Sequence, residues 1–567
     1  MTRGHWHVWM VLALSVGLGA GCKSPTPTAA GRSQSTSSSA STRAKPKARA
    51  ADPARVASAH AHYAAGIIAE MNGDAATACD EFQRAVTEDP DDEALLLDVT
   101  RRLLQNKRAE KALEFLLATT ARGNVSGEIY ARLGHVHFQL GHVEEAIRAN
   151  RLAIQKAPQL LTGYQNLFLN LLVSKQNEEA IKLLDTAAAQ EKAAPEFLLG
   201  LADLYQNYAQ QFPTQRAAIQ KKSLATLQAA AAQKPADPQL RLRLADGFYT
   251  LGETQRAAEI YLPLLPQLED LPLLLENVRA KLAEFYLRSD DRAHAREQLE
   301  AIVRADPANA QAHYFLASIA YDEKRWAVAA EHLRTTLLLS PQFEQAHYDL
   351  AAAQLALEDA PGALATLAGA RARFAQNFIG EYLSAMAEIR GKNFSAAVKH
   401  FVTAEIIARA TEPKRLTAEF YFDLGSTCER AGDREEAAKQ FEKALKLKPE
   451  FPEAQNYLGY MWAERGENLE RARDLIAQAL KAEPKSAAYL DSMGWVLFKL
   501  NQPQAALEYL LKAVAESENP DATLYDHLGD IYSALNQADK ARAAWQKSLT
   551  VDDTEAVRKK LNSTTPP

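Results

Sequence analysis

Apolar and small residues recur along the chain with the spacing of paired amphipathic helices. In residues 128–158, Leu133 and Gly134 lie on a first helix and Gly141 marks a turn. Ala146, on the next helix, is small enough to let the two backbones approach closely, and Pro158 ends that helix. The frame consists of Tyr130, Leu133, Gly134, Gly141, Ala146, Ala153 and Pro158. The pattern predicts a helix pair that repeats about every 34 residues.

The same frame returns far along the chain. A second clear copy contains Tyr421, Leu424, Gly425, Gly432, Ala437, Phe441, Ala444 and Pro449. Further copies are marked by Leu282, Ala283 and Pro307, by Leu458, Gly459 and Pro484, and by Leu528, Gly529 and Trp545. Because one pair alone cannot cover its apolar face, neighbouring pairs must stack. We expect roughly fourteen pairs between Val56 and Leu561.

The period and the residues of this frame match the consensus of the tetratricopeptide repeat (TPR). The resemblance implies an all-α fold, a right-handed TPR superhelical solenoid. In such a solenoid the first helices line a concave surface, and that surface binds extended peptides or partner helices.

Two regions interrupt the repeat. Residues 205–222 are too long for a TPR turn and contain Pro213, and a second break contains Pro263, Pro266 and Pro272. We therefore expect an N-terminal array at 56–210, irregular repeats or a bend at 211–275, and a C-terminal array at 276–561. Residues 562–567 are expected to be a disordered tail.

The first residues have the pattern of an export signal. Arg3 precedes an apolar stretch from Val8 to Ala20, which has the length of a signal-peptide core. The stretch ends in Leu-Gly-Ala-Gly-Cys, with Cys22 last, and this resembles the lipobox of bacterial lipoproteins, although Gly19 stands where leucine is usual. Residues 1–21 are thus expected to be removed and Cys22 to be lipidated. The alternative is an ordinary cleaved signal in which Cys22 has no role.

Residues 22–55 form the expected tether. They consist mainly of Ser, Thr, Pro, Ala, Lys and Arg, and such a segment cannot bury enough apolar surface to fold. Lys23 follows the cysteine, whereas an aspartate there retains enterobacterial lipoproteins at the inner membrane. By resemblance, we expect the chain at the periplasmic face of the outer membrane.

Charge argues against a nucleic-acid partner. The formal net charge is -6, and the tether is basic, which leaves the residues after 55 with a net charge of -13. A nucleic-acid groove needs a basic stripe on the folded part of a protein.

The sequence offers no recognisable catalytic, metal or cofactor site. Cys79 and Cys428 occupy apolar helix positions, so both are expected to be small buried hydrophobes. His135 and His137 are two residues apart on a helix and point in nearly opposite directions, unlike the i, i+4 pair that holds zinc. Phosphate-binding loops, nucleophile elbows and Cys-x-x-Cys pairs are also missing. We expect a protein that is not an enzyme.

The C-terminal repeats are more specific than the TPR consensus. The runs Asn456–Tyr460, Tyr489–Trp495 and His527–Asp530 resemble the C-terminal block of bacterial TPR lipoproteins, most of all the outer-membrane adaptors of periplasmic carboxyl-terminal processing proteases. These adaptors bring a protease together with substrates that include peptidoglycan hydrolases. The family has no catalytic residues, and Cys22 matches its lipidation site.

If the helix frame is right, five residues project from first helices toward the concave side: Asn456, Tyr460, Asp491, Trp495 and Asp526. One interpretation is that they line a partner-binding groove. The other is that they cap turns or pack the repeats together. For the chain as a whole we consider two functions, an adaptor for a protease or cell-wall enzyme and a structural assembly factor of an exopolysaccharide or pilus export complex.

Overall fold

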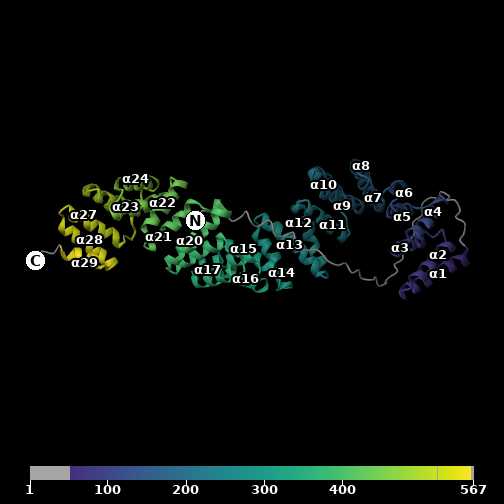
Figure 1. The fold of residues 1–567 in the computed structure, drawn as a ribbon, viewed down its shortest axis with the longest axis horizontal. Coiled ribbons are helices and arrows are strands. Elements are labelled where there is room, and N and C mark those ends of the chain that lie inside the picture. Colours follow the sequence, from purple (N-terminus) through teal and green to yellow (C-terminus); the bar gives the residue numbers. More distant parts are fainter. Residues whose placement is uncertain (1–51, 520, 564–567) are drawn as a thin grey trace. The chain divides into compact units, whose positions relative to one another are not determined.

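The computed structural model describes residues 52–519 and 521–563 (Figure 1). The expected signal peptide, the lipidation site Cys22 and the tether up to residue 51 lie outside the described residues. The described chain forms two compact units that divide after Leu152, inside helix α6.

The unit before the division contains six helices in three consecutive pairs. These are α1 (Pro53–Met71), α2 (Ala75–Glu88), α3 (Glu93–Gln105), α4 (Ala109–Thr120), α5 (Gly127–Gln139) and α6 (Val143–Lys156), of which α6 continues past Leu152.

The unit after the division continues the same alternation of helices (Figure 1). Its first half contains α7 (Leu161–Val173), α8 (Asn177–Ala188), α9 (Pro195–Gln211), α10 (Arg216–Ala232), α11 (Pro238–Thr250), α12 (Thr254–Tyr261), α13 (Pro272–Arg288), α14 (Arg292–Ala305), α15 (Ala310–Asp322), α16 (Trp326–Leu339), α17 (Glu344–Ala356) and α18 (Ala360–Arg371).

Its second half contains α19 (Phe378–Arg390), α20 (Phe394–Thr411), α21 (Ala418–Arg430), α22 (Arg434–Leu447), α23 (Pro452–Arg465), α24 (Leu469–Ala482), α25 (Ala487–Lys499), α26 (Pro503–Glu516), α27 (Ala522–Ala534), α28 (Ala538–Val551) and α29 (Glu555–Ser563). Over the described residues there are 29 α-helices and no strand, in a repeated arrangement that agrees with the expected all-α solenoid of roughly fourteen pairs. We call the odd-numbered member of each pair the first helix and the even-numbered member the second helix, which leaves α29 over.

Most pairs turn through a residue with left-handed backbone. These residues include Gly73, Lys107, Gly141 and Lys175, then Asp290, Lys324, Glu358 and Lys392, each 34 positions after the one before it within its series. Only Gly adopts this conformation without a steric penalty. The 34-residue period is therefore kept even where the turn residue is a lysine, an aspartate or a glutamate.

Within a pair, a glycine of the first helix receives a large side chain of the second. A Cβ added at Gly425 would lie 2.9 Å from the ring of Phe441, and Gly66 and Gly529 face Phe82 and Trp545 in the same way. The repeat frame predicts that Gly425 on the first helix meets the small Ala437 on the second, but the atoms nearest to Gly425 belong to Phe441. Small residues at these points let the two helices pack closely.

The prolines that end second helices take part in a recurring hydrogen bond. The carbonyl oxygens of Pro158 and Pro449 accept hydrogen bonds from Tyr164 and Gln455, at 3.0 and 2.8 Å. Each donor lies six residues after its proline, on the next first helix. The bond fixes the turn from one pair to the next.

The two interruptions seen in the sequence are irregular in the structure. α9 and α10 are both 17 residues long and are joined through a short 3-10 helix at Pro213–Gln215. α12 has only 8 residues and continues into a 3-10 helix at Leu262–Leu268, after which α13 begins at Pro272. The division of the repeats into two arrays around residues 211–275 stays a prediction.

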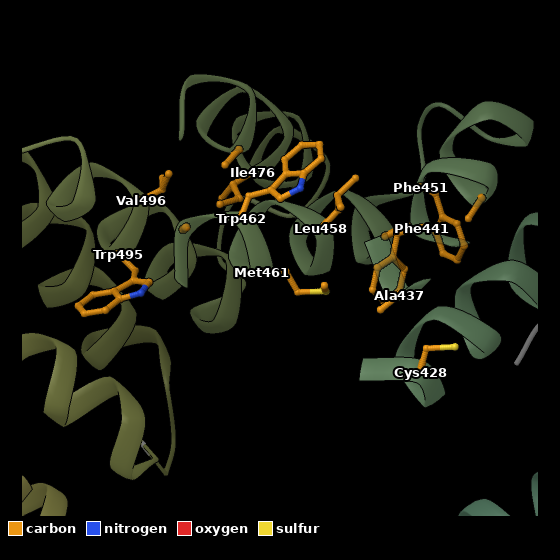
Figure 2. Close-up of a cluster of buried hydrophobic side chains, with 14 of the residues drawn as sticks. Cys428, Ala437, Phe441, Phe451, Leu458, Met461, Trp462, Ile476, Trp495 and Val496 are labelled. Carbon is orange, nitrogen blue, oxygen red and sulfur yellow. The ribbon is translucent and has the colours of Figure 1, made fainter. Parts of the chain in front are cut away.

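The largest core runs through the C-terminal pairs. Figure 2 shows part of it, from Cys428 and Phe441 to Trp462 and Val496. Cys79 and Cys428 are free and buried, as expected for small core residues, and burial raises the pKa of the Cys428 thiol to about 12. Among the helices described, none combines the length and the apolar content that a bilayer crossing requires.

Candidate partner-binding site

The predicted groove residues lie on three first helices that contact one another. α23 contacts α25, and α25 contacts α27. Asn456, Asp491 and Asp526 recur 35 positions apart, one on each helix, and Tyr460 and Trp495 have the same separation. Equal spacing on stacked helices places each series along one face.

Trp495 and His527 form the centre of this face. The two rings are stacked, with centroids 3.8 Å apart and planes inclined by 14°. The indole Nε1–H of Trp495 donates a hydrogen bond to Oε1 of Glu464 at 2.5 Å, and His527 Nδ1 lies 2.9 Å from Oδ1 of Asp491. The stack thus joins α23, α25 and α27 through one aromatic pair and two carboxylates.

Tyr460 lies beside this stack. Its ring centroid is 6.2 Å from that of His527. Burial is the main reason why the pKa of the Tyr460 hydroxyl lies well above its ordinary value, and the nearby carboxylates of Glu464, Asp491 and Asp521 add to the effect. The hydroxyl is therefore a permanent hydrogen-bond donor at any physiological pH.

Asp526 is engaged by the last helix. Nζ of Lys560, on α29, lies 2.8 and 2.9 Å from the two carboxylate oxygens of Asp526 and 2.7 Å from Oδ2 of Asp530. Burial raises the pKa of Asp530, although the hydrogen bond from Lys560 opposes that shift. One lysine thus serves both carboxylates.

Asn456 differs from the other four residues. Its side chain is buried, with 8% exposed, and within the described residues its Oδ1 has no hydrogen-bond partner. A buried amide oxygen without a donor is costly, and among the five predicted groove residues this is the one buried side-chain atom of the described chain left without a partner.

The arrangement suits protein binding and helix packing better than catalysis. Trp495 is 7% exposed and belongs to the core cluster, so it holds helices together, while Tyr460, Asp491 and Asp526 are partly exposed. Over the described residues no three His, Cys, Asp or Glu side chains are grouped so as to hold a metal ion. His137 and His142 approach each other, with their Nδ1 atoms 3.4 Å apart, but no carboxylate or thiol completes a set.

Three residues of this face were not singled out as groove residues from the sequence. His527 was read only as part of a family motif, and Glu464 and Lys560 were not considered. His527 could have been found from its place one residue beyond the 35-residue series of Asn456, Asp491 and Asp526. Lys560 carried no such signal, because α29 stands outside the paired frame.

The comparisons with known proteins identify the repeat. Two tetratricopeptide-repeat family models match the chain, one over residues 281–346, 422–488 and 465–523 and the other over residues 127–159 and 522–555. No curated protein matches it.

Several solved structures are similar in fold at low sequence identity. One is the Cut9–Hcn1 hetero-tetramer of APC/C, which is 14% identical. The match covers 82% of this chain and 95% of the other chain, with a TM-score of 0.36. A tetratricopeptide repeat protein from Parabacteroides merdae is 17% identical, with coverages of 51% and 98% and a TM-score of 0.32. YrrB, described as a TPR protein with an unusual peptide-binding site, is 16% identical, with coverages of 34% and 95% and a TM-score of 0.30. The chain carries tetratricopeptide repeats and has the fold of a TPR solenoid.

Proposed function

We propose that this chain is a non-catalytic scaffold that binds other proteins along its first helices. The observation that carries the proposal is the continuous face made by α23, α25 and α27, on which aromatic and hydrogen-bonding side chains alternate at a regular spacing. Aromatic side chains surrounded by polar groups are typical of the centres of protein interfaces, and the partly exposed Tyr460 is the aromatic of this face that a partner can contact.

The proposal includes a place in the cell. A short apolar segment that ends at Cys22 supports lipidation of that cysteine, and the Ser- and Pro-rich residues after it support a tether about 30 Å in reach. We place the chain on the periplasmic face of the outer membrane, where it recruits a processing protease or a cell-wall enzyme and its substrates.

The anchor is tested by replacing Cys22 with Ser. The Cys22→Ser protein is expected to incorporate no labelled fatty acid and to leave the outer-membrane fraction. If it still sediments with membranes as an integral component, the lipid anchor is wrong.

The binding face is tested by photo-crosslinking in the native host. A photoreactive phenylalanine analogue at Tyr460 probes the first-helix face, and the same analogue at Leu447, a 55% exposed residue of the second helix α22, is the matched control. We expect a discrete protein adduct at Tyr460 and none at Leu447. Mass spectrometry of the adduct then separates a protease or peptidoglycan hydrolase from a component of an export complex. Equal adducts at both positions would contradict a binding face on the first helices.

A further inference from the structure

A second surface lies far along the chain from the C-terminal face, on the neighbouring first helices α7 and α9. α7 has no charged residue in its 13 positions, unlike every other α-helix that the structure describes. Its residues Gln165, Phe168, Leu169 and Leu172 follow the i, i+3, i+4, i+7 spacing of one helix face. A helix that presents such a stripe without charge is suited to contact something other than water.

α9 supplies the opposite wall. Leu204, Asn207, Gln210 and Gln211 face the α7 stripe across a groove of about 240 Å³. We call these eight lining residues the amide groove. Its floor is buried, since Phe168 is 4% and Leu204 is 7% exposed, while Leu169 on the rim is 47% exposed. The groove is thus apolar at the bottom and polar at the edges.

The four amide side chains of the groove are not used by the fold. Gln165, Asn207, Gln210 and Gln211 are exposed, and their side chains make no hydrogen bond to any described residue. Amides in the neighbouring connections behave differently. Gln159, just before α7, donates to the carbonyl of Lys192, and Gln233, just after α10, donates to that of Ala193. The groove therefore holds four carboxamides with their hydrogen-bonding capacity open.

The chemistry of the lining selects its occupant. A carboxamide has a carbonyl acceptor and N–H donors, the same two groups that each peptide unit of an extended chain must satisfy when it leaves water. None of the eight lining residues is charged, so a charged side chain in the groove would lose its hydration without gaining a partner. The volume lies below the roughly 300 to 1,000 Å³ of small-molecule and cofactor pockets. It suits one or two side chains instead.

We propose that the amide groove binds an extended, uncharged peptide segment of a partner protein. An apolar side chain of that segment packs on Phe168 and Leu204 between Leu169 and Leu172, and the four carboxamides pair with its backbone N–H and C=O groups. The proposal rests on the proposed scaffold function and adds a second binding surface with a defined preference.

A displayed library of random decapeptides, selected against the full chain without its signal peptide, tests the preference. We expect the selected sequences to be uncharged around an apolar residue. One selected peptide, synthesised with blocked ends and a fluorophore, then serves as the probe for variants. A library that returns charged sequences overturns the proposal.

Two groove variants and two matched controls locate the binding. Leu169→Glu places a charge on the exposed rim, and the pair Gln165→Ala and Gln210→Ala removes two carboxamides. We expect the affinity for the probe to fall at least about tenfold in each. Leu338→Glu, at an 81% exposed leucine of α16, and Gln342→Ala, at an exposed glutamine, are expected to bind like the parent. Circular dichroism checks that all variants stay helical.

Three outcomes would overturn the amide groove. The first is normal binding of the probe to the groove variants, and the second is a selection that returns no peptide. The third is a change of oligomeric state in Leu169→Glu, seen by light scattering, which would make the groove a contact between two copies. In each case the photo-crosslinking at Tyr460 still decides the proposed scaffold function, because that residue lies on α23 and not in the groove.

Discussion

The imidazole of His527 lies flat against the indole of Trp495, and the two rings connect α25 to α27 at the centre of the C-terminal face. Trp495 also donates to Glu464, on α23, and so touches three consecutive pairs. Replacing it with Ala removes a buried anchor and is expected to cost about 3 to 5 kcal/mol. Trp495→Ala therefore cannot separate binding from folding, and milder changes are needed.

Trp495→Phe keeps a ring against His527 and removes the donor to Glu464. We expect it to destabilise α25 and α27 by about 0.5 to 1.5 kcal/mol, because the hydrogen bond is lost while the exposed carboxylate of Glu464 can turn to water. Glu464→Met, which removes the acceptor, is expected to cost a similar amount, and the double variant less than the sum of the two. Hydrogen exchange of the α25 and α27 amides measures these values. Strict additivity would show that the hydrogen bond does not stabilise the stack.

Gly425 tests the packing within one pair. Leu at this position meets the fully buried ring of Phe441, and overpacking of this kind costs about 1 to 3 kcal/mol. Gly369, on α18, is the control, since a Cβ there meets only the tip of Arg373 at 3.8 Å. Gly369→Leu is expected to keep or raise stability, because Leu favours a helix more than Gly. Denaturation of the two variants by urea compares them, and an equal effect would contradict the packing described here.

Tyr314 and Asp349 make a contact between first helices whose stability depends on pH. The hydroxyl of Tyr314 donates to Oδ2 of Asp349 at 2.8 Å, and burial raises the pKa of that carboxyl. The folded protein thus holds the proton to higher pH than the unfolded chain, and stability falls as pH rises from about 4 through the folded pKa. Asp349→Asn keeps an acceptor for Tyr314 without the charge. We expect its advantage over the parent to be absent near pH 4 and to grow toward pH 7, as measured by hydrogen exchange in α15 and α17.

The equivalent contact near the N-terminus has a pH dependence of stability with the opposite sign. Tyr63 donates to Asp98 at 2.6 Å, and although burial alone would raise the pKa of Asp98, the hydrogen bonds from Tyr63, Arg102 and Arg101 lower it to about 2. This carboxylate stabilises the fold above pH 4, and its contribution is lost as pH falls toward 2. Asp98→Asn is expected to weaken α1 and α3 at pH 7 by about 1 to 2 kcal/mol and to match the parent near pH 2. An Asp98→Asn effect that does not change with pH would contradict this assignment.

Lys324 tests the turns. Its backbone φ is 59°, a left-handed value that costs a residue with a side chain about 1 to 2 kcal/mol. Gly adopts this value without strain, but it loses more backbone entropy on folding. Lys324→Gly is expected to stabilise α15 and α16 by about 0.5 to 1 kcal/mol. Lys399→Gly, inside α20, is the control and is expected to cost about 1 kcal/mol. Hydrogen exchange of the flanking helices measures both variants. A loss of stability in Lys324→Gly would contradict the left-handed backbone at this turn.

Much of the fold was predictable because the repeat is local. Gly141, Gly432 and the helix-ending prolines fix the frame with contacts a few residues away, so two clear copies sufficed to predict the rest. The turns at Lys107, Lys175, Lys324 and Lys392 gave no such signal. Lysine is not a turn residue by propensity, and only the stacking of the flanking helices holds it in the left-handed region.

The sites were less predictable because they depend on the offset between neighbouring pairs. The frame placed Tyr460, Asp491 and Trp495 on first helices, but it did not show that His527 would meet both Asp491 and Trp495. The amide groove did leave a trace in the sequence. A stretch of 13 residues without charge, from Leu161 to Val173, stands out in a chain with 24% charged residues.

The equal spacing of the turns at Asp290, Lys324, Glu358 and Lys392 bears on how such a gene changes length. Excision of residues 325–358 would join Lys324 to Asp359 and leave every remaining turn in phase, so the loss of one whole period is a small structural event. The deletion would leave a local mark, because Tyr314 would then face Leu383 in place of Asp349 and lose its acceptor. Paralogues shortened by one period at this point would be recognisable by a phenylalanine where this chain has Tyr314.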